Sequence, residues 1–237
     1  MTVIPAREPV PALAALGIVA FTTTRRSGDF GIPADGPTDA ARDRWTELLR
    51  SLVHARRMAS ARQVHGRTVL AHTDDWDGWR RVDGADGHVT ATPGTALVVT
   101  VADCVPVFLA HASGAVGLLH AGWRGVAGNV FSAGIDAMQS LGVPANELHV
   151  HLGPAISGRH YEVGPDVYRQ LTGWETIRSR RVDLRALLAE QARACGVRHL
   201  TASHYCTLED RDRFFSHRGG DAARQVAVIA SPPVAPT

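Results

Sequence analysis

Residues 95–120 read TALVVTVADCVPVFLAHASGAVGLLH, and this stretch decides the fold. Thr95–Ala102 is short, apolar and rich in β-branched residues, which is typical of a buried strand. Val105–Ala110 and Ala115–His120 are two further candidate strands, and the His-Ala-Ser-Gly segment between them is typical of a hairpin turn. The stretch therefore predicts three strands, the last two of which form a hairpin.

Helices are expected on both sides of this stretch. Asp39–Val53 carries a tryptophan and three leucines at helical spacing, and Val126–Leu141 has helical spacing up to a Gly and a Pro that end it. Further expected elements are a strand at Glu147–Leu152, a helix from Pro165 to Leu171, a helix capped by Asp183 and running to Cys195, and strands at Arg198–Ala202 and Gln225–Ala230. Hairpins and helical crossovers in one chain predict the α/β class with a mixed sheet.

The chain shows no internal repeat and no long linker, so we expect one domain over residues 1–237, with 231–237 as a loose tail. The Gly- and Pro-rich stretch 28–37 is expected to be a loop. A chain of 237 residues buries enough surface to fold without disulfides or a structural metal.

Composition excludes several kinds of function. The 25 basic residues, all arginine, are spread along the chain and balance 23 acidic residues, so we expect no nucleic-acid partner. Without lysine there is neither a Schiff-base lysine nor a P-loop. Three cysteines make no disulfide framework and favour a reducing compartment, so a cytoplasmic location is expected. The longest apolar stretch, Val10–Phe21, is too short to span a bilayer, so no membrane partner is expected.

Three short segments carry side chains suited to chemistry: Arg62–Gly66, Val101–Pro106 and Leu119–Gly125. Each places an imidazole or a thiol near the end of a strand-like segment, where α/β sheets usually bind ligands. Together His65, Cys104 and His120 could supply the three protein ligands of a catalytic zinc, and the same set also suits copper. Two other interpretations stay open, namely a buried cysteine with two hydrogen-bonded histidines, and a cysteine nucleophile with a histidine base.

The segment His120-Ala-Gly-Trp-Arg-Gly125 passes from a strand through two glycines into a helix. Glycine lets the backbone approach a ligand closely, and a helix N-terminus presents free amides to an anion. Arg124 could add a bidentate clamp on a phosphate or carboxylate, or it could be an ordinary solvated arginine.

At these segments the chain resembles the laccase-domain family, also called the peptidoglycan-editing factor or multicopper polyphenol oxidase family, whose members are described as purine nucleoside phosphorylases. The matching pieces occur in the expected order over nearly the whole chain. They are Phe21–Arg25 (FTTTR), Gln63–Gly66 (QVHG), Ala102–Cys104 (ADC), His120–Gly125 (HAGWRG), Gly153–Ile156 (GPAI), Tyr161–Gly164 (YEVG), Tyr205–Thr207 (YCT) and Phe214–Arg218 (FFSHR).

The resemblance implies a single α/β domain of mixed sheets layered with helices, similar to an α/β/β/α sandwich. It also implies a zinc ion bound by His65, Cys104 and His120, with purine nucleosides and phosphate as substrates. The expected activities are phosphorolysis of adenosine, inosine, guanosine and methylthioadenosine, together with deamination of adenosine. Copper-dependent phenol oxidation and the editing of peptidoglycan precursors are the alternatives that the family carries.

Further residues receive expected roles from this resemblance. Asp103, next to the catalytic ligand Cys104, either shuttles protons or orients a ligand histidine. Arg124 and Arg25 are expected to hold phosphate, and Gln63 is expected to contact substrate. A multicopper oxidase needs many clustered histidines, and this chain has one His-x-His pair, His149-Val-His151, which favours zinc. The oligomeric state is not predicted.

Overall fold

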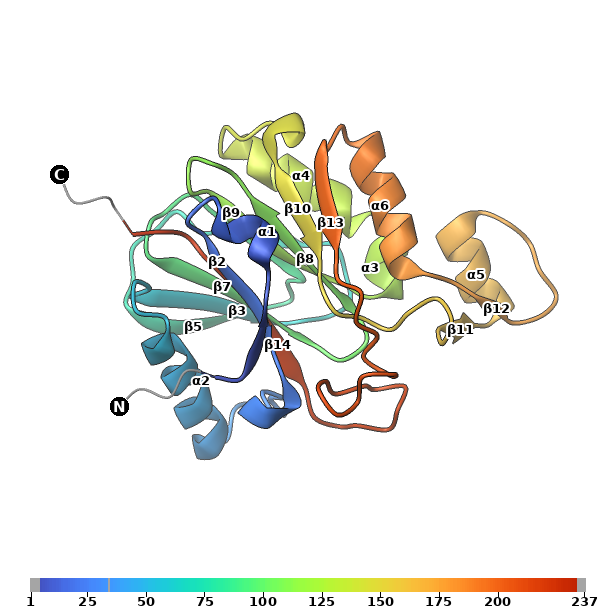
Figure 1. Ribbon diagram of the computed structural model, residues 1–237, viewed down its shortest axis with the longest axis horizontal. Coiled ribbons are helices and arrows are strands. Elements are labelled where there is room, and N and C mark those ends of the chain that lie inside the picture. The colour runs from blue at the N-terminus through green and yellow to red at the C-terminus, as the bar shows by residue number, and fades with distance from the viewer. Residues whose placement is uncertain (1–4, 34, 234–237) are drawn as a thin grey trace.

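Two β-sheets pack face to face, and helices cover the outer face of each (Figure 1). The computed structural model describes residues 5–33 and 35–233. Over these residues each sheet has six strands, and the layering confirms the expected α/β class with mixed sheets in an α/β/β/α sandwich.

The first sheet has the strand order β1-β2-β14-β7-β3-β5. These strands are β1 (Arg7–Pro9), β2 (Val19–Thr23), β14 (Gln225–Ala230), β7 (Thr95–Val101), β3 (Arg57–Arg62) and β5 (Gly78–Asp83). The second sheet has the order β13-β10-β8-β9-β6-β4. Its strands are β13 (His199–Ala202), β10 (His149–Leu152), β8 (Val105–Ala110), β9 (Val116–Ala121), β6 (Gly87–Thr90) and β4 (Val69–Ala71).

The expected hairpin is confirmed, because β8 and β9 pair antiparallel in the second sheet while β7 lies in the first. Successive side chains of a strand point to opposite faces. Leu97 of β7, Phe108 of β8 and Leu118 of β9 therefore fill the space between the sheets, while the next residue, Leu119, points outward toward the helices. Burial on both faces explains why these strands are apolar at every position.

Helices complete the two outer layers. On the first sheet lies α2 (Asp39–Ser51), which presses Trp45 and Leu48 onto the outer face and begins at the cap Thr38. On the second sheet lie α4 (Val130–Ser140) and α6 (Leu184–Ala194). The remaining short elements are α1 (Pro11–Ala14), η1 (Arg25–Ser27), α3 (Trp123–Ala127), η2 (Ala145–Glu147), β11 (Glu162–Val163), α5 (Pro165–Thr172) and β12 (Arg180–Arg181).

One expected helix is wrong as a single element. The helical pattern over Val126–Leu141 is divided into α3 and α4 because Asn129 adopts a left-handed conformation, with φ of 59°. Asparagine tolerates this conformation better than most residues. The Gln191 side chain of α6 donates to the carbonyl of Val126 at 3.0 Å, and the same carbonyl accepts the backbone N–H of Asn129 at 3.1 Å.

Two other boundaries are corrected. The strand expected at Glu147–Leu152 begins only at His149, because the preceding residues form η2. The expected loose tail does not begin at 231, since the buried Ser231 donates through its hydroxyl to the Gly114 carbonyl at 2.8 Å. Residues 234–237 of that tail lie outside the described residues. The predicted loop at 28–37 contains no helix or strand where it is described.

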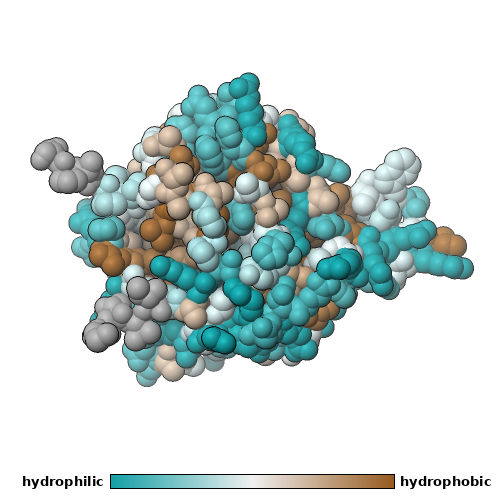
Figure 2. All heavy atoms as spheres, in the orientation of Figure 1, coloured by the Kyte–Doolittle hydropathy of each residue, from teal (hydrophilic) through white to brown (hydrophobic). Residues whose placement is uncertain are grey.

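Residues 161–182 form a lobe that projects from the sandwich and includes β11, α5 and β12 (Figure 1). Trp174 and Ile177 are exposed large hydrophobic side chains in this lobe, and Figure 2 shows hydrophobic surface at its tip beside hydrophilic surface. Within the described part of the chain, none of the helices is both long and apolar enough to cross a membrane.

Candidate metal centre and its cavity

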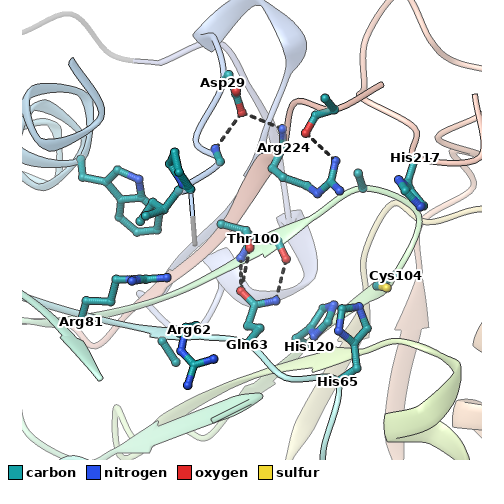
Figure 3. A pocket seen from close by; sticks show the side chains of 17 residues that line it. Asp29, Arg62, Gln63, His65, Arg81, Thr100, Cys104, His120, His217 and Arg224 are labelled. Atoms are coloured by element: carbon teal, nitrogen blue, oxygen red, sulfur yellow. Dashed lines mark hydrogen bonds between the residues drawn. The ribbon is translucent and has the colours of Figure 1, made fainter. Parts of the chain in front are cut away.

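A cavity of about 550 Å³ opens where β3, β7 and β9 reach the same end of the sandwich (Figure 3). Its volume lies within the range of roughly 300–1,000 Å³ that is usual for small-molecule sites. Several segments far apart in the sequence share its wall. The lining residues are Asp29, Gly31, Ile32, Pro33, Trp45, Ala61, Arg62, Gln63, His65, Arg81, Thr100, Ala102, Cys104, His120, His217, Ala222 and Arg224.

His65, Cys104 and His120 meet at one end of this cavity, and one potential ligand atom from each lies within 4.8 Å of the others. Figure 3 shows the two imidazoles and the thiol side by side. His65 follows β3 in a turn, Cys104 lies between β7 and β8, and His120 belongs to β9. This is the single group of three or more such ligands among the residues that the structure describes.

The backbone around the three side chains is shaped for close approach. His65 and Asp103 both adopt positive φ, 58° and 83°, which turns the chain sharply beside each ligand. A Cβ atom at Gly122 would lie 2.9 Å from the Cys104 Sγ and 3.0 Å from the His65 Cδ2. Because Gly122 has no Cβ, the side chains of Cys104 and His65 can lie close to its backbone, and any other residue at this position would crowd them.

Asp86, the residue immediately before β6, holds two of the three candidate ligands in place. Its carboxylate is fully buried and accepts the backbone N–H groups of Val64, His65 and Gly66. The same carboxylate lies 2.8 Å from the Nδ1 of His120. Nδ1 must carry the proton of this hydrogen bond, so Nε2 is left with the lone pair that a metal needs.

The charge distribution favours a metal ligand set. Burial opposes ionisation of Cys104, but the charges and hydrogen bonds of His120 and His65 outweigh burial and lower the pKa of the thiol to about 6. Burial also opposes protonation of His120, but Cys104 and Asp86 outweigh it and raise the pKa of the imidazole to about 9. Without metal, a thiolate and an imidazolium therefore face each other at neutral pH.

Metal affinity is expected to rise with pH. Between pH 6 and 9 the pKa values of Cys104 and His120 require one proton to leave His120 for each metal bound, so affinity should increase about tenfold per pH unit. Below pH 6 the thiol is protonated as well, and the dependence should become steeper. Competition with a chelator of known affinity over pH 5–10 measures this, and a flat profile would contradict the assignment of these two ligands.

The carboxylate of Asp103 is hydrogen-bonded to neither His65 nor His120. Its buried carboxylate accepts the hydroxyl of Thr207 at 2.5 Å and the backbone N–H of Arg218 at 2.6 Å. These bonds tie the loop after β13 to the segment that carries Cys104. The task of orienting a ligand histidine belongs instead to Asp86, which the sequence analysis did not single out.

Gln63 lines the cavity, but its amide is already engaged by Thr100 of β7. The Gln63 Oε1 accepts the Thr100 backbone N–H at 2.7 Å and its hydroxyl at 2.8 Å, and the Gln63 Nε2 donates to the Thr100 carbonyl at 2.8 Å. The side chain thus bridges β3 and β7 beyond the last residue pair of their ladder, Ala59 with Leu97.

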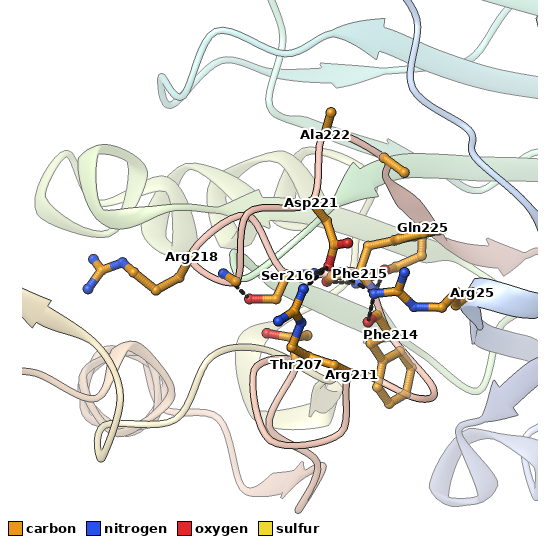
Figure 4. A network of polar contacts seen from close by, with 12 residues as sticks. Arg25, Thr207, Arg211, Phe214, Phe215, Ser216, Arg218, Asp221, Ala222 and Gln225 are labelled. Carbon is orange, nitrogen blue, oxygen red and sulfur yellow. Dashed lines mark hydrogen bonds and ion pairs between the residues drawn. The ribbon is translucent and has the colours of Figure 1, made fainter.

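Arg25 and Arg124, which were expected to hold phosphate, are not among the residues that line the cavity. The Arg25 Nη2 lies 2.8 Å from the Oδ2 of Asp221, and its guanidinium covers the ring of Phe215 (Figure 4). Arg124 is exposed, with its guanidinium 4.4 Å from the ring centre of Trp123. The ion pair of Arg25 with Asp221 holds the loop that contains both Asp221 and His217, and His217 lines the cavity.

Comparisons with known proteins identify relatives of the whole domain. Residues 26–231 match the family model described as multi-copper polyphenol oxidoreductase laccase. The purine nucleoside phosphorylase ORF3 of Streptomyces griseus is 37% identical over 178 residues, which is 70% of this chain and 71% of that protein. A purine nucleoside phosphorylase of Mycobacterium tuberculosis strain H37Rv is 36% identical over 215 residues, covering 83% of this chain and 85% of that one.

Solved structures agree with the fold. The chain is similar to YlmD from Geobacillus stearothermophilus, with a TM-score of 0.85, 28% identity and 94% of each chain covered. A hypothetical protein, YfiH, of Bacillus licheniformis has the same TM-score of 0.85 at 23% identity, with 95% of this chain and 96% of that chain covered, and shows the likeness of the fold.

Proposed function

The chain belongs to the multi-copper polyphenol oxidoreductase laccase family, and on that premise we propose that it is a metal-dependent purine nucleoside phosphorylase. Its substrates would be adenosine, inosine, guanosine and methylthioadenosine, with phosphate as the second substrate. The observation that carries the proposal is the cluster of His65, Cys104 and His120 in the wall of a cavity of small-molecule size. The relatives named purine nucleoside phosphorylase support it.

The resident metal is proposed to be zinc, bound by His65, Cys104 and His120. A thiolate with two imidazoles suits zinc, and three protein ligands leave a fourth position for water or substrate. When bound, zinc supplies a Lewis acid and a water molecule whose pKa is near 7. Copper suits the same ligands, but a multicopper centre needs further clusters of ligands. Among the residues that the structure describes, His65, Cys104 and His120 form the one such cluster, which favours zinc.

The residues of the chain would act on the nucleoside in separate ways. In phosphorolysis the bond between C1′ and the purine nitrogen breaks, a phosphate oxygen bonds to C1′, and the purine takes up a proton. His217 and Arg224 line the cavity together with the proposed metal ligands. We propose that these two side chains bind the phosphate and the leaving purine. Asp103 and Arg25 would act indirectly, because they hold the loop that carries His217. Positioning and charge stabilisation would supply most of the rate.

Adenosine deamination is proposed as a second activity of the same cavity. In this reaction water adds to C6 of the purine and ammonia leaves, so the site needs an activated water molecule and a path for protons. Asp103 is not proposed as the proton shuttle, because both of its carboxylate oxygens already accept hydrogen bonds. A thiol hydrolase would use Cys104 as a free nucleophile, which is incompatible with metal ligation by the same sulfur.

Chromatography of adenosine incubated with the purified protein tests both activities. We expect adenine to form only when phosphate is present and inosine to form with or without it. If adenosine, inosine and methylthioadenosine all remain intact with a metal-loaded protein, the phosphorylase proposal is overturned. The peptidoglycan-precursor alternative would then gain support.

A further inference from the structure

Arg81 lies at the end of the cavity remote from the proposed metal ligands. It comes from β5, the edge strand of the first sheet, and lines the cavity together with Trp45. Figure 3 shows Arg81 on one side and Cys104 and His65 on the other, with the Gln63–Thr100 pair between them. A ligand whose reacting bond lies near the metal would therefore have to extend along the cavity to reach Arg81.

The guanidinium of Arg81 has no carboxylate partner among the described residues. Its Nε is buried and makes no hydrogen bond there. The carboxylate of Asp83, nearby on the same strand, pairs with Arg62 at 2.9 Å. The preceding residue, Arg80, is paired with Asp74 at 2.5 Å. The Nε atoms of Arg25, Arg57 and Arg213 are also buried without a hydrogen bond, but each of these arginines has a carboxylate partner. Arg81 is half-buried, lines the cavity and has no such partner in the described part of the chain, so its guanidinium is available to an anionic ligand.

The cavity wall as a whole has an excess of positive charge. The wall contains three arginines, Arg62, Arg81 and Arg224, and one carboxylate, that of Asp29. The Oδ1 of Asp29 already accepts the backbone N–H groups of Gly31 and Arg224, at 2.7 and 2.8 Å. The net charge of the wall favours an anionic ligand over a neutral one.

We propose that Arg81 binds the phosphate group of a phosphorylated nucleoside, so that nucleoside 5′-monophosphates belong to the ligand class of this cavity. The proposal rests on the proposed function, which places a nucleoside in the cavity. The purine and the ribose are neutral at pH 7, so a phosphate substituent is what supplies the anion. A guanidinium matches two phosphate oxygens with a pair of parallel N–H donors. The phosphate that reacts at C1′ must lie at the other end, near the metal ligands.

Calorimetric titration of the metal-loaded protein in phosphate-free buffer tests the proposal. The probes are inosine and inosine 5′-monophosphate, because inosine can be neither deaminated further nor phosphorolysed without phosphate. We expect the monophosphate to bind at least about tenfold more tightly than inosine. In Arg81→Gln this preference should disappear.

Arg80→Gln is the matched control, because it removes the same charge from the same strand but not from the cavity wall. It should retain the preference for the monophosphate. An equal loss in both variants would show a general effect of charge and overturn the proposal, as would equal affinity of wild-type protein for the two probes. The comparison of inosine with inosine 5′-monophosphate on the wild-type protein does not depend on the folding of any variant.

A kinetic measurement separates Arg81 from the phosphate co-substrate. If Arg81→Gln raises the KM for inorganic phosphate and keeps the preference for the monophosphate, the arginine binds the co-substrate and the proposal is overturned. Failure of the proposed function gives a different result, namely inosine that binds but stays intact when phosphate is added.

Discussion

Replacing Cys104 with alanine is expected to abolish metal binding and nucleoside phosphorolysis together. The thiolate is one of three proposed ligands, and it carries the negative charge because the charges and hydrogen bonds of His120 and His65 outweigh the effect of burial on its pKa. Two neutral imidazoles bind zinc far more weakly than two imidazoles with a thiolate. We expect about one metal ion per chain in the wild-type protein and almost none in Cys104→Ala after dialysis, as measured by atomic emission.

Cys206→Ala is the matched control for this experiment. Cys206 is a buried cysteine on the loop after β13, and its sulfur accepts the backbone N–H of Ser157 at 3.3 Å rather than joining the ligand cluster. This variant should keep its metal and its activity. Activity retained by a metal-free Cys104→Ala would contradict the metal assignment. Metal retained by an inactive Cys104→Ala would favour the cysteine nucleophile instead.

The central strands could be predicted because both of their faces are buried. In β7, β8 and β9 nearly every position is buried, so the sequence shows an uninterrupted apolar run with a turn in it. The edge strand β5 has the opposite character. Its sequence GWRRVD is half-buried and polar along most of its length, and its pairing with β3 is visible only after folding. Such a strand carries neither the alternation nor the apolar run that identifies strands.

The three proposed metal ligands could be picked out from the sequence, and the residues that hold them in place could not. His65, Cys104 and His120 have side chains whose chemistry is distinctive at any position in a sequence. Asp86 is an ordinary acidic residue in a Gly-rich turn, and its role depends on partners 21 and 34 residues away. The partners of Asp103 are more than 100 residues away, so no local pattern indicates that its carboxylate is engaged.

Arg25 shows that a family motif, like a local sequence pattern, does not reveal how a side chain is paired in the folded protein. A motif places the residue in the site region, but its ion pair with Asp221 spans 196 residues of sequence. The charge of Arg25 is therefore used within the protein, whereas the unassigned Arg81 faces the cavity. Which arginine is free to meet a ligand is decided by tertiary pairing, which the positions of charges along a chain do not reveal.

Asp86→Asn is expected to weaken metal binding by about 10–100-fold, although Asp86 is not itself a proposed ligand. The asparagine keeps one oxygen acceptor but loses the charge that holds His120 and the backbone of residues 64–66. Its new NH₂ group would also face backbone N–H groups, where only an acceptor is satisfied. Hydrogen bonds to a buried charge contribute about 1.5–3 kcal/mol each, so the metal-free variant should lose about 2–4 kcal/mol of unfolding free energy.

Asp83→Asn separates this effect from a simple loss of negative charge, because Asp83 lies three residues earlier and is 81% exposed in its pair with Arg62. An exposed ion pair contributes about 0–1 kcal/mol, so this control should retain both stability and metal affinity. Chelator competition measures the affinity, and urea denaturation of the metal-free proteins measures the stability. If Asp86→Asn binds metal as tightly as Asp83→Asn, the orientation of His120 does not depend on the Asp86 carboxylate. If it loses affinity but no stability, Asp86 acts on His120 alone and the turn at residues 64–66 stands without it.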